Sequence, residues 1–175
     1  MTLRVSDIIW ESIVDGPGFR CAVFAQGCDH NCDGCHNPQT WNKYDGNSVD
    51  IDGIIQNMRK NPLLRGITLS GGEPFMQADA MAELARKARA AGYDVVAYTG
   101  YTFDELMERS ACEPGILALL EQVDLLIDGP YDKHCRNLNL LFRGSENQRL
   151  VDVKKSLMDK NEVFLVKEED LFLQV

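Results

Sequence analysis

The sequence RCAVFAQGCDHNCDGC, residues 20–35, joins an apolar run to a polar loop that carries three of the six cysteines of the chain. The apolar part, residues 20–26, predicts a buried strand that leads directly into the loop. In the loop, Cys28, Cys32 and Cys35 stand at CxxxCxxC spacing. A strand that ends in such a loop predicts a reaction centre at its carboxyl end.

Three thiolates are the feature of this loop that matters chemically. They can hold a [4Fe–4S] cluster while one iron has no protein ligand, and that iron can bind a substrate or cofactor. A zinc site is the alternative, because the three cysteines with His30 or His36 could form a Cys₃His centre. Zinc sites usually draw their ligands from two separated pairs, whereas these candidates all lie within nine residues. The spacing therefore favours the iron–sulfur cluster.

The composition is that of an ordinary globular protein with an acidic balance. Hydrophobic residues make up 45% and charged residues 26% of the 175 residues, and the net charge is -9. This length predicts a single domain over residues 1–175, in which residues 154–175 form a C-terminal extension without an assigned role. The acidic charge disfavours a nucleic-acid partner.

The expected location of the protein follows from what the sequence lacks. No apolar run is long enough to span a membrane, and the N-terminus has no basic region followed by an apolar region, as a signal peptide would. We therefore expect a cytoplasmic protein without a membrane partner. In a reducing cytoplasm, three cysteines within eight residues indicate metal ligation and not disulfides.

Predicted strands and helices alternate along the chain. The apolar runs predict strands at residues 20–26, 66–70, 94–98 and 125–127, with weaker candidates at 148–153 and 163–166 and a short helix or turn between those two. Helical periodicity and end signals predict helices at 49–60, at 77–91, from Thr102 onward and at 116–123. This alternation predicts an α/β fold with a parallel sheet and right-handed crossovers.

Four polar or glycine-rich turns follow predicted strands. They are the cysteine loop, Gly71-Gly72-Glu73, Thr99-Gly100 and Asp128-Gly129. In parallel sheets the ligand site lies beyond the carboxyl ends of the strands, so we expect these turns to meet at one edge. The two glycines would let the backbone approach a ligand closely, and the Glu73 carboxylate could accept hydrogen bonds from an ammonium group. Taken alone, this turn is also compatible with an ordinary tight turn.

A cysteine loop of this spacing followed by GGE at a strand end resembles the radical S-adenosylmethionine superfamily. The stretches DGPGFR (15–20), QGC (26–28), CHN (35–37) and TW (40–41) are similar to the activases of glycyl-radical enzymes. Two groups of activases are similar in this region, those of pyruvate formate-lyase and those of anaerobic ribonucleoside-triphosphate reductase. The short chain without a further ferredoxin-like cysteine insert favours the second group, as do TGY (99–101), LIDGPY (126–131) and RGSENQR (143–149).

The resemblance implies a role for each matching residue. Cys28, Cys32 and Cys35 would ligate a [4Fe–4S] cluster whose fourth iron is chelated by S-adenosylmethionine. The cofactor would further be contacted by Gly34, His36, Gly71, Gly72, Glu73, Thr99 and Asp128. Of these, the GGE residues would hold the methionine amino group, and the backbone around Gly34 and His36 would pack on the adenine. Gly34 departs from the broad superfamily, in which an aromatic residue often precedes the third cysteine.

The resemblance also implies the reaction, the partners and the fold. Reductive cleavage of S-adenosylmethionine would give a 5′-deoxyadenosyl radical, which would take a hydrogen from a glycine of anaerobic ribonucleoside-triphosphate reductase. A low-potential donor such as flavodoxin would supply the electron, and no general base is needed. Because a full barrel needs about 250 residues, the fold would be an incomplete (β/α) barrel of the radical S-adenosylmethionine type, open on one side. The alternatives are an activase of another glycyl-radical enzyme and a zinc-stabilised interaction module.

Overall fold

The computed structural model of the protein describes residues 1–159 and 162–172. Its strands are β1 (Thr2–Ser12), β2 (Arg20–Ala25), β3 (Asn47–Asp50), β4 (Gly66–Gly71), β5 (Asp94–Tyr98), β6 (Leu125–Asp128) and β7 (Arg149–Asp152). Its α-helices are α1 (Ile51–Met58), α2 (Ala78–Ala90), α3 (Phe103–Ser110), α4 (Pro114–Leu120) and α5 (Val153–Met158). Short 3₁₀ helices span Pro38–Thr40, Pro74–Gln77, Lys133–Cys135 and Glu168–Asp170.

All seven strands form one sheet in the order β3-β1-β2-β4-β5-β6-β7. The central strands β2, β4, β5 and β6 are parallel, which confirms that part of the prediction. The prediction of a parallel sheet is wrong at both edges, where β1 runs antiparallel to β2 and β3 and β7 runs antiparallel to β6. The β1–β2 connection, residues 13–19, has no crossover helix, and parallel neighbours need one. The fold is therefore α/β with a mixed sheet.

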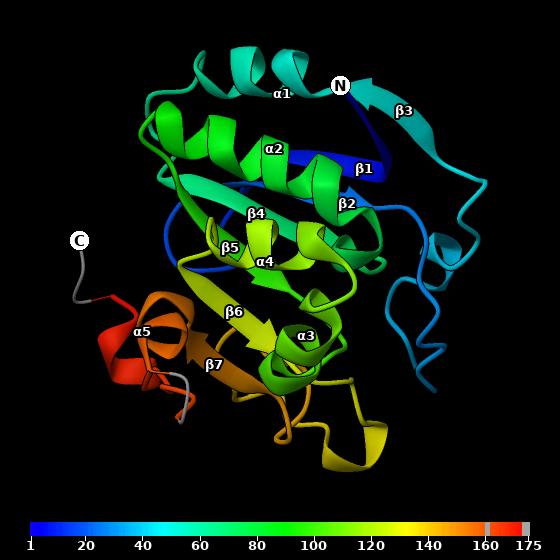
Figure 1. Cartoon of the computed structure of the whole chain (residues 1–175), viewed down its shortest axis with the longest axis vertical. Coiled ribbons are helices and arrows are strands. Elements are labelled where there is room, and N and C mark those ends of the chain that lie inside the picture. The colour runs from blue at the N-terminus through cyan, green and yellow to red at the C-terminus, as the bar shows by residue number, and fades with distance from the viewer. Residues whose placement is uncertain (160–161, 173–175) are drawn as a thin grey trace.

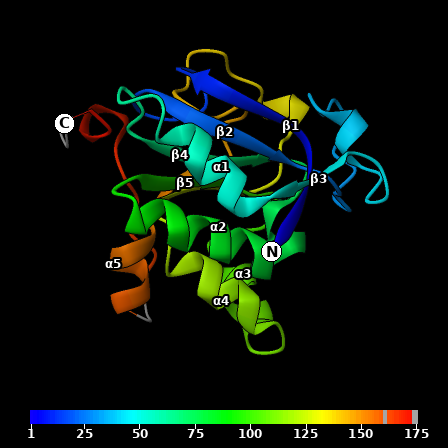
Figure 2. The same ribbon diagram turned by 90° about the horizontal axis from the view of Figure 1, so that it is seen from above.

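The sheet is covered differently on its two faces. Helices α2, α3 and α4 lie on one side of it (Figure 2), where Val95 and Ala97 belong to the larger hydrophobic core. Val96 points to the opposite face and belongs to a second, smaller cluster with Ile127, Leu150 and Leu171. Helices thus cover one face, and part of the C-terminal extension packs on the other.

Residues 165–166 of the C-terminal extension pair with β7. Val166 N–H donates to Leu150 O at 2.8 Å, and Leu165 forms an isolated bridge with Val151. The strand predicted at 148–153 is confirmed as β7, whereas residues 163–166 form this single bridge and no strand. The short helix expected between the two segments is α5.

Capping side chains set the first residues of helices α1 and α3. Helix α1 begins at Ile51 and not at residue 49, because Asp50 accepts a hydrogen bond from Gly53 N–H and residues 47–50 pair with β1. The capping box predicted at Thr102 is confirmed by reciprocal bonds between Thr102 and Glu105. Helix α3 therefore starts directly after the Thr99-Gly100 turn. None of the helices among the described residues is long and apolar enough to cross a membrane.

Candidate functional site

A cavity of about 230 Å³ lies at the carboxyl ends of the parallel strands. The side chains of Cys28, Cys32 and Cys35 line it together with Gly71-Gly72, Thr99-Gly100 and Gly129. The arrowheads of β2 and β6 point to this side of the molecule (Figure 1), where the cysteine loop and the loop after β6 also lie. The four turns that follow the parallel strands therefore meet, as the predicted alternation of strands and helices implied.

A larger cavity, of about 520 Å³, lies at the amino ends of β5 and β6. Most of its charged residues form ion pairs. Asp124 pairs with Arg89 and Lys154, and Asp94 pairs with Arg65. Among the described residues, neither a thiol cluster nor a glycine turn lines it, so the smaller cavity is the candidate site.

The cysteine loop is folded by residues with positive φ angles. Gly27, Asn31 and Gly34 have φ values of 101°, 48° and 79°, a region that glycine and asparagine enter most readily. Burial raises the pKa of Cys28 to about 11 and also raises the pKa of Cys32. Both thiols are therefore protonated at neutral pH in this structure, and metal ligation would release their protons.

Three thiols, each able to bind a different iron, are the donor set that a [4Fe–4S] cluster needs. Among residues 1–159 and 162–172, no three Cys, His, Asp or Glu side chains form a ready-made group for a single metal ion. In a [4Fe–4S] cluster each thiolate binds a different iron, so the sulfur atoms stay apart. The donor set and the cavity therefore fit the cluster.

The turn after β4 needs glycine because it packs against the strand that leads to the cysteines. Gly71 has a φ of 93°, and a Cβ atom there would lie 2.6 Å from Ala25 N. A Cβ at Gly72 would lie 2.3 Å from Gly27 O. Glu73 N–H donates to the same carbonyl at 2.8 Å. Both glycines line the cavity, so the close approach that fixes this turn also exposes its backbone to a ligand.

Glu73 is fully buried behind the cavity wall. Its carboxylate accepts hydrogen bonds from Phe75 N–H (3.0 Å), Thr99 Oγ1 (3.0 Å), Gly100 N–H (2.9 Å) and His30 Nε2 (2.8 Å). The cavity is lined by Gly71 and Gly72 but not by Glu73. In this structure the carboxylate joins three turns of the site, and its contact with a cofactor stays a prediction.

The side chains of Thr99 and Asp128 also bond to other groups of the protein. Thr99 lines the cavity, but its hydroxyl donates to Glu73 and accepts from Tyr101 N–H at 3.1 Å. Asp128 is fully buried, accepts from Phe103 N–H at 2.7 Å and forms an ion pair with Arg149 at 2.5 Å. This pairing raises the pKa of Arg149. Asp128 thus holds the start of α3 in place, and contacts of either residue with a cofactor stay predictions.

His36 lines the cavity beside an aromatic residue, the last of the LIDGPY motif, to which the sequence analysis gave no role. Its ring centroid lies 5.2 Å from that of Tyr131. Gly34 has no side chain to reach the cavity, but a Cβ at this position would lie 3.5 Å from the Tyr131 ring. Tyr131 comes three residues after Asp128, so its position in a strand-end turn was the signal available in the sequence.

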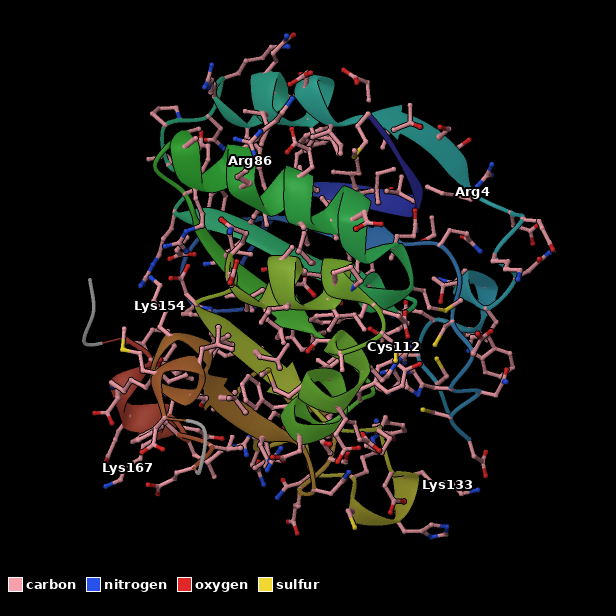
Figure 3. The ribbon with its side chains drawn as sticks, viewed as in Figure 1. Arg4, Arg86, Cys112, Lys133, Lys154 and Lys167 are labelled. Atoms are coloured by element: carbon pink, nitrogen blue, oxygen red, sulfur yellow. The ribbon has the colours of Figure 1, made fainter. Side chains whose placement is uncertain are left out.

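The loop after β6 also reaches the cysteine loop. Lys133 forms an ion pair with Asp33, and Figure 3 shows Lys133 just below the cysteine loop. His30, which the sequence analysis named only as a candidate ligand of the alternative zinc centre, is bonded to Glu73 in the structure. Its side chain is 17% exposed.

Comparisons with known proteins agree with this site. The family model described as a 4Fe-4S single cluster domain matches residues 14–151. The anaerobic ribonucleoside-triphosphate reductase-activating protein of Enterobacteria phage T4 is 34% identical over 143 residues, which cover 78% of this chain and 86% of that protein. The proteins of the same name from Escherichia coli K12 and Vibrio cholerae are each 35% identical over 144 residues, covering 78% of this chain and 90% and 89% of theirs.

Among solved structures, the crystal structure of QueE from Escherichia coli matches 58% of this chain and 54% of that chain at 18% identity. Its TM-score of 0.49 leaves the fold family open. The assignment rests instead on the matches in sequence, and the family model over residues 14–151 spans the cysteine loop and the other three turns of the site. The chain belongs to the family of anaerobic ribonucleoside-triphosphate reductase-activating proteins.

Proposed function

We propose that this protein is an iron–sulfur activase that installs a glycyl radical on anaerobic ribonucleoside-triphosphate reductase. The observation that carries this proposal is the shared cavity of Cys28, Cys32, Cys35 and the Gly71-Gly72 turn. The named relatives favour this target over pyruvate formate-lyase. All three thiols lie in one loop, which disfavours a zinc-stabilised module, because zinc sites usually draw their ligands from two separated pairs.

The three thiolates of Cys28, Cys32 and Cys35 would hold a [4Fe–4S] cluster and leave one iron for the amino and carboxylate groups of S-adenosylmethionine. When bound, the cluster and S-adenosylmethionine would supply the chemistry. Transfer of one electron would cleave S-adenosylmethionine to methionine and a 5′-deoxyadenosyl radical, which would take a hydrogen atom from the target glycine. The chain itself needs no general base for this chemistry. Its task is to hold the two groups together and to keep water away from them.

Each wall of the cavity has a separate part in that task. The Gly71-Gly72 turn would bring backbone groups close to the methionine amino group, and Glu73 fixes that turn from behind. Gly34 and His36 would border the adenine, together with Tyr131. Thr99 and Asp128 would hold the turns that face the ribose or the methionyl group.

We propose that the fold is an incomplete (β/α) barrel. We also propose that residues 1–175 form a single domain. The four parallel strands and the helices on one face support this proposal. The open side would admit the glycine-bearing loop of the reductase. A low-potential donor such as flavodoxin would reduce the cluster, and the reaction would take place in the cytoplasm.

Electron paramagnetic resonance on an anaerobic mixture tests the proposal. The mixture contains reconstituted protein, a strong reductant, S-adenosylmethionine and an anaerobic ribonucleotide reductase. We expect a glycyl-type doublet that disappears when any one component is left out. Cleavage of S-adenosylmethionine without a doublet would reject this partner, and the lack of any cluster signal would reject the activase.

A further inference from the structure

His30 lies between two of the cysteines and reaches across the site to the buried carboxylate. Its Nε2 is 2.8 Å from Glu73 Oε2, and its side chain is 17% exposed, whereas Glu73 is fully buried. The ring also makes an edge contact with Tyr101, with 4.4 Å between ring centroids. His30 is 43 residues from Glu73 in the sequence, so this bond joins two separate turns of the site.

The backbone at the next turn leaves room for this histidine. A Cβ atom at Gly100 would lie 2.6 Å from the His30 ring. Gly100 N–H donates to the same Glu73 oxygen that His30 contacts. The imidazole therefore fills a space that the β5 turn keeps free, and the carboxylate holds both the turn and the loop.

A second side-chain tether of this loop is much more exposed. Asp33 forms its ion pair with Lys133, and the two side chains are 78% and 46% exposed. Exposed pairs of this kind contribute little, because water screens them and both side chains lose freedom. A hydrogen bond to a buried carboxylate is stronger and more directional. Of these two tethers, the His30–Glu73 bond is the one able to fix the loop.

We propose that His30 is a positioning residue that fixes the cluster-binding loop onto Glu73 and so holds Cys28 and Cys32 in place for the cluster. This inference rests on the proposed function and deepens it. It gives the glutamate of the glycine turn a further role, as the anchor of the cysteine loop. Groups that orient metal ligands typically change metal affinity or activity by about 10- to 100-fold when they are removed.

Iron release from the anaerobically reconstituted full-length protein tests this role without relying on turnover. A ferrous chelator is added to wild type, His30→Ala, His30→Gln and the control Asp33→Asn, and the release rate is followed by absorbance. We expect His30→Ala to lose iron roughly tenfold faster than wild type. His30→Gln, whose amide can still donate to Glu73, should regain much of the retention, and Asp33→Asn should behave as wild type.

A spectroscopic readout separates positioning from a general loss of stability. The paramagnetic resonance signal of the reduced cluster, with and without S-adenosylmethionine, should change shape in His30→Ala while thermal unfolding of the apoprotein stays close to wild type. If His30→Ala does not fold, His30→Phe replaces it, because it keeps an aromatic ring and loses the donor. Equal iron release from the donor-free variant and wild type would overturn the inference and leave the proposed function intact. A wild-type protein that holds no cluster would overturn both.

Discussion

Arg20 and Glu73 are two fully buried charged side chains at opposite ends of the parallel strands. The amino ends of these strands form the amino edge of the sheet, and their carboxyl ends form the carboxyl edge. Arg20 opens β2 at the amino edge, and its guanidinium contacts Asp94 at 2.5 Å and donates to Thr68 Oγ1 at 2.8 Å. Glu73 follows β4 at the carboxyl edge and, within residues 1–159 and 162–172, forms no ion pair with Lys or Arg. One charge is neutralised by its opposite, and the other is held by N–H and O–H donors.

This difference is in line with the position of the candidate site at the carboxyl edge. A buried cation with its carboxylate partner and satisfied donors joins strands and has nothing left to bind a ligand. The Glu73 carboxylate, held by N–H and O–H donors, lies behind the wall of an adjoining cavity. A cationic ligand, such as the sulfonium and ammonium groups of S-adenosylmethionine, would complement this carboxylate.

The largest expected effect comes from removing a thiol at the carboxyl edge. Cys32→Ala should abolish the cluster and the cleavage of S-adenosylmethionine, because two remaining thiolates cannot replace the missing ligand. The unfolding free energy of the apoprotein should change little, since Cys32 is partly exposed. Iron content and methionine release measure the result, with the exposed Cys112→Ala as control. Full cleavage activity in Cys32→Ala would disprove the ligand assignment.

Arg20→Met should have the opposite profile, a loss of stability without a direct effect on the cluster. Removing one member of a buried pair costs about 3–5 kcal/mol. We expect about 3 kcal/mol, because Asp94 is 31% exposed and keeps its pair with Arg65. Denaturant unfolding measures this change, and the exposed Arg86→Met is the matched control with no measurable change. An unchanged midpoint for Arg20→Met would remove the contrast between the two edges.

Two glycine substitutions sharpen the comparison within the carboxyl edge. Gly100→Ala should displace the His30 ring, because the new Cβ would lie 2.6 Å from it, and iron should be released roughly tenfold faster. Gly53→Ala in α1 meets nothing within 4 Å and should stabilise the protein by about 0.5–1 kcal/mol. The chelator assay and thermal unfolding are applied to both variants. Iron release from Gly100→Ala at the wild-type rate would show that the space beside Gly100 is not needed to retain the cluster.

The smallest effect is expected at the ion pair between Glu168 and Arg143, which is nearer the surface than Arg20 and Glu73. Glu168 also accepts Leu141 N–H at 3.1 Å, and Arg143 lowers the pKa of its carboxyl. The contact is therefore present at neutral pH and is lost as the pH falls through that lowered pKa. Glu168→Ala should increase hydrogen exchange at the Leu141 amide, whereas the exposed Glu169→Ala should not. Equal exchange in both variants would mean that the pair does not hold this segment.

Local sequence determined much of the parallel centre of the fold. The capping box at Thr102 and the apolar runs of β2, β4, β5 and β6 depend on neighbours a few residues away, so periodicity and end signals predicted them. The cysteine spacing is also local, and it identified the three thiols that line the cavity.

The tertiary structure alone decided the outer strands of the sheet and the hydrogen bonds that hold the turns of the site together. In β1, Ile9 and Trp10 are exposed while Leu3 and Val5 are buried, so its sequence has no simple alternation, and pairing with β2 and β3 makes it a strand. The sequence singled out Glu73 as a ligand contact, but the fold buried it and bonded it to His30 and Thr99. Such contacts join residues far apart in the chain, and no local pattern encodes which distant donors will surround a buried charge.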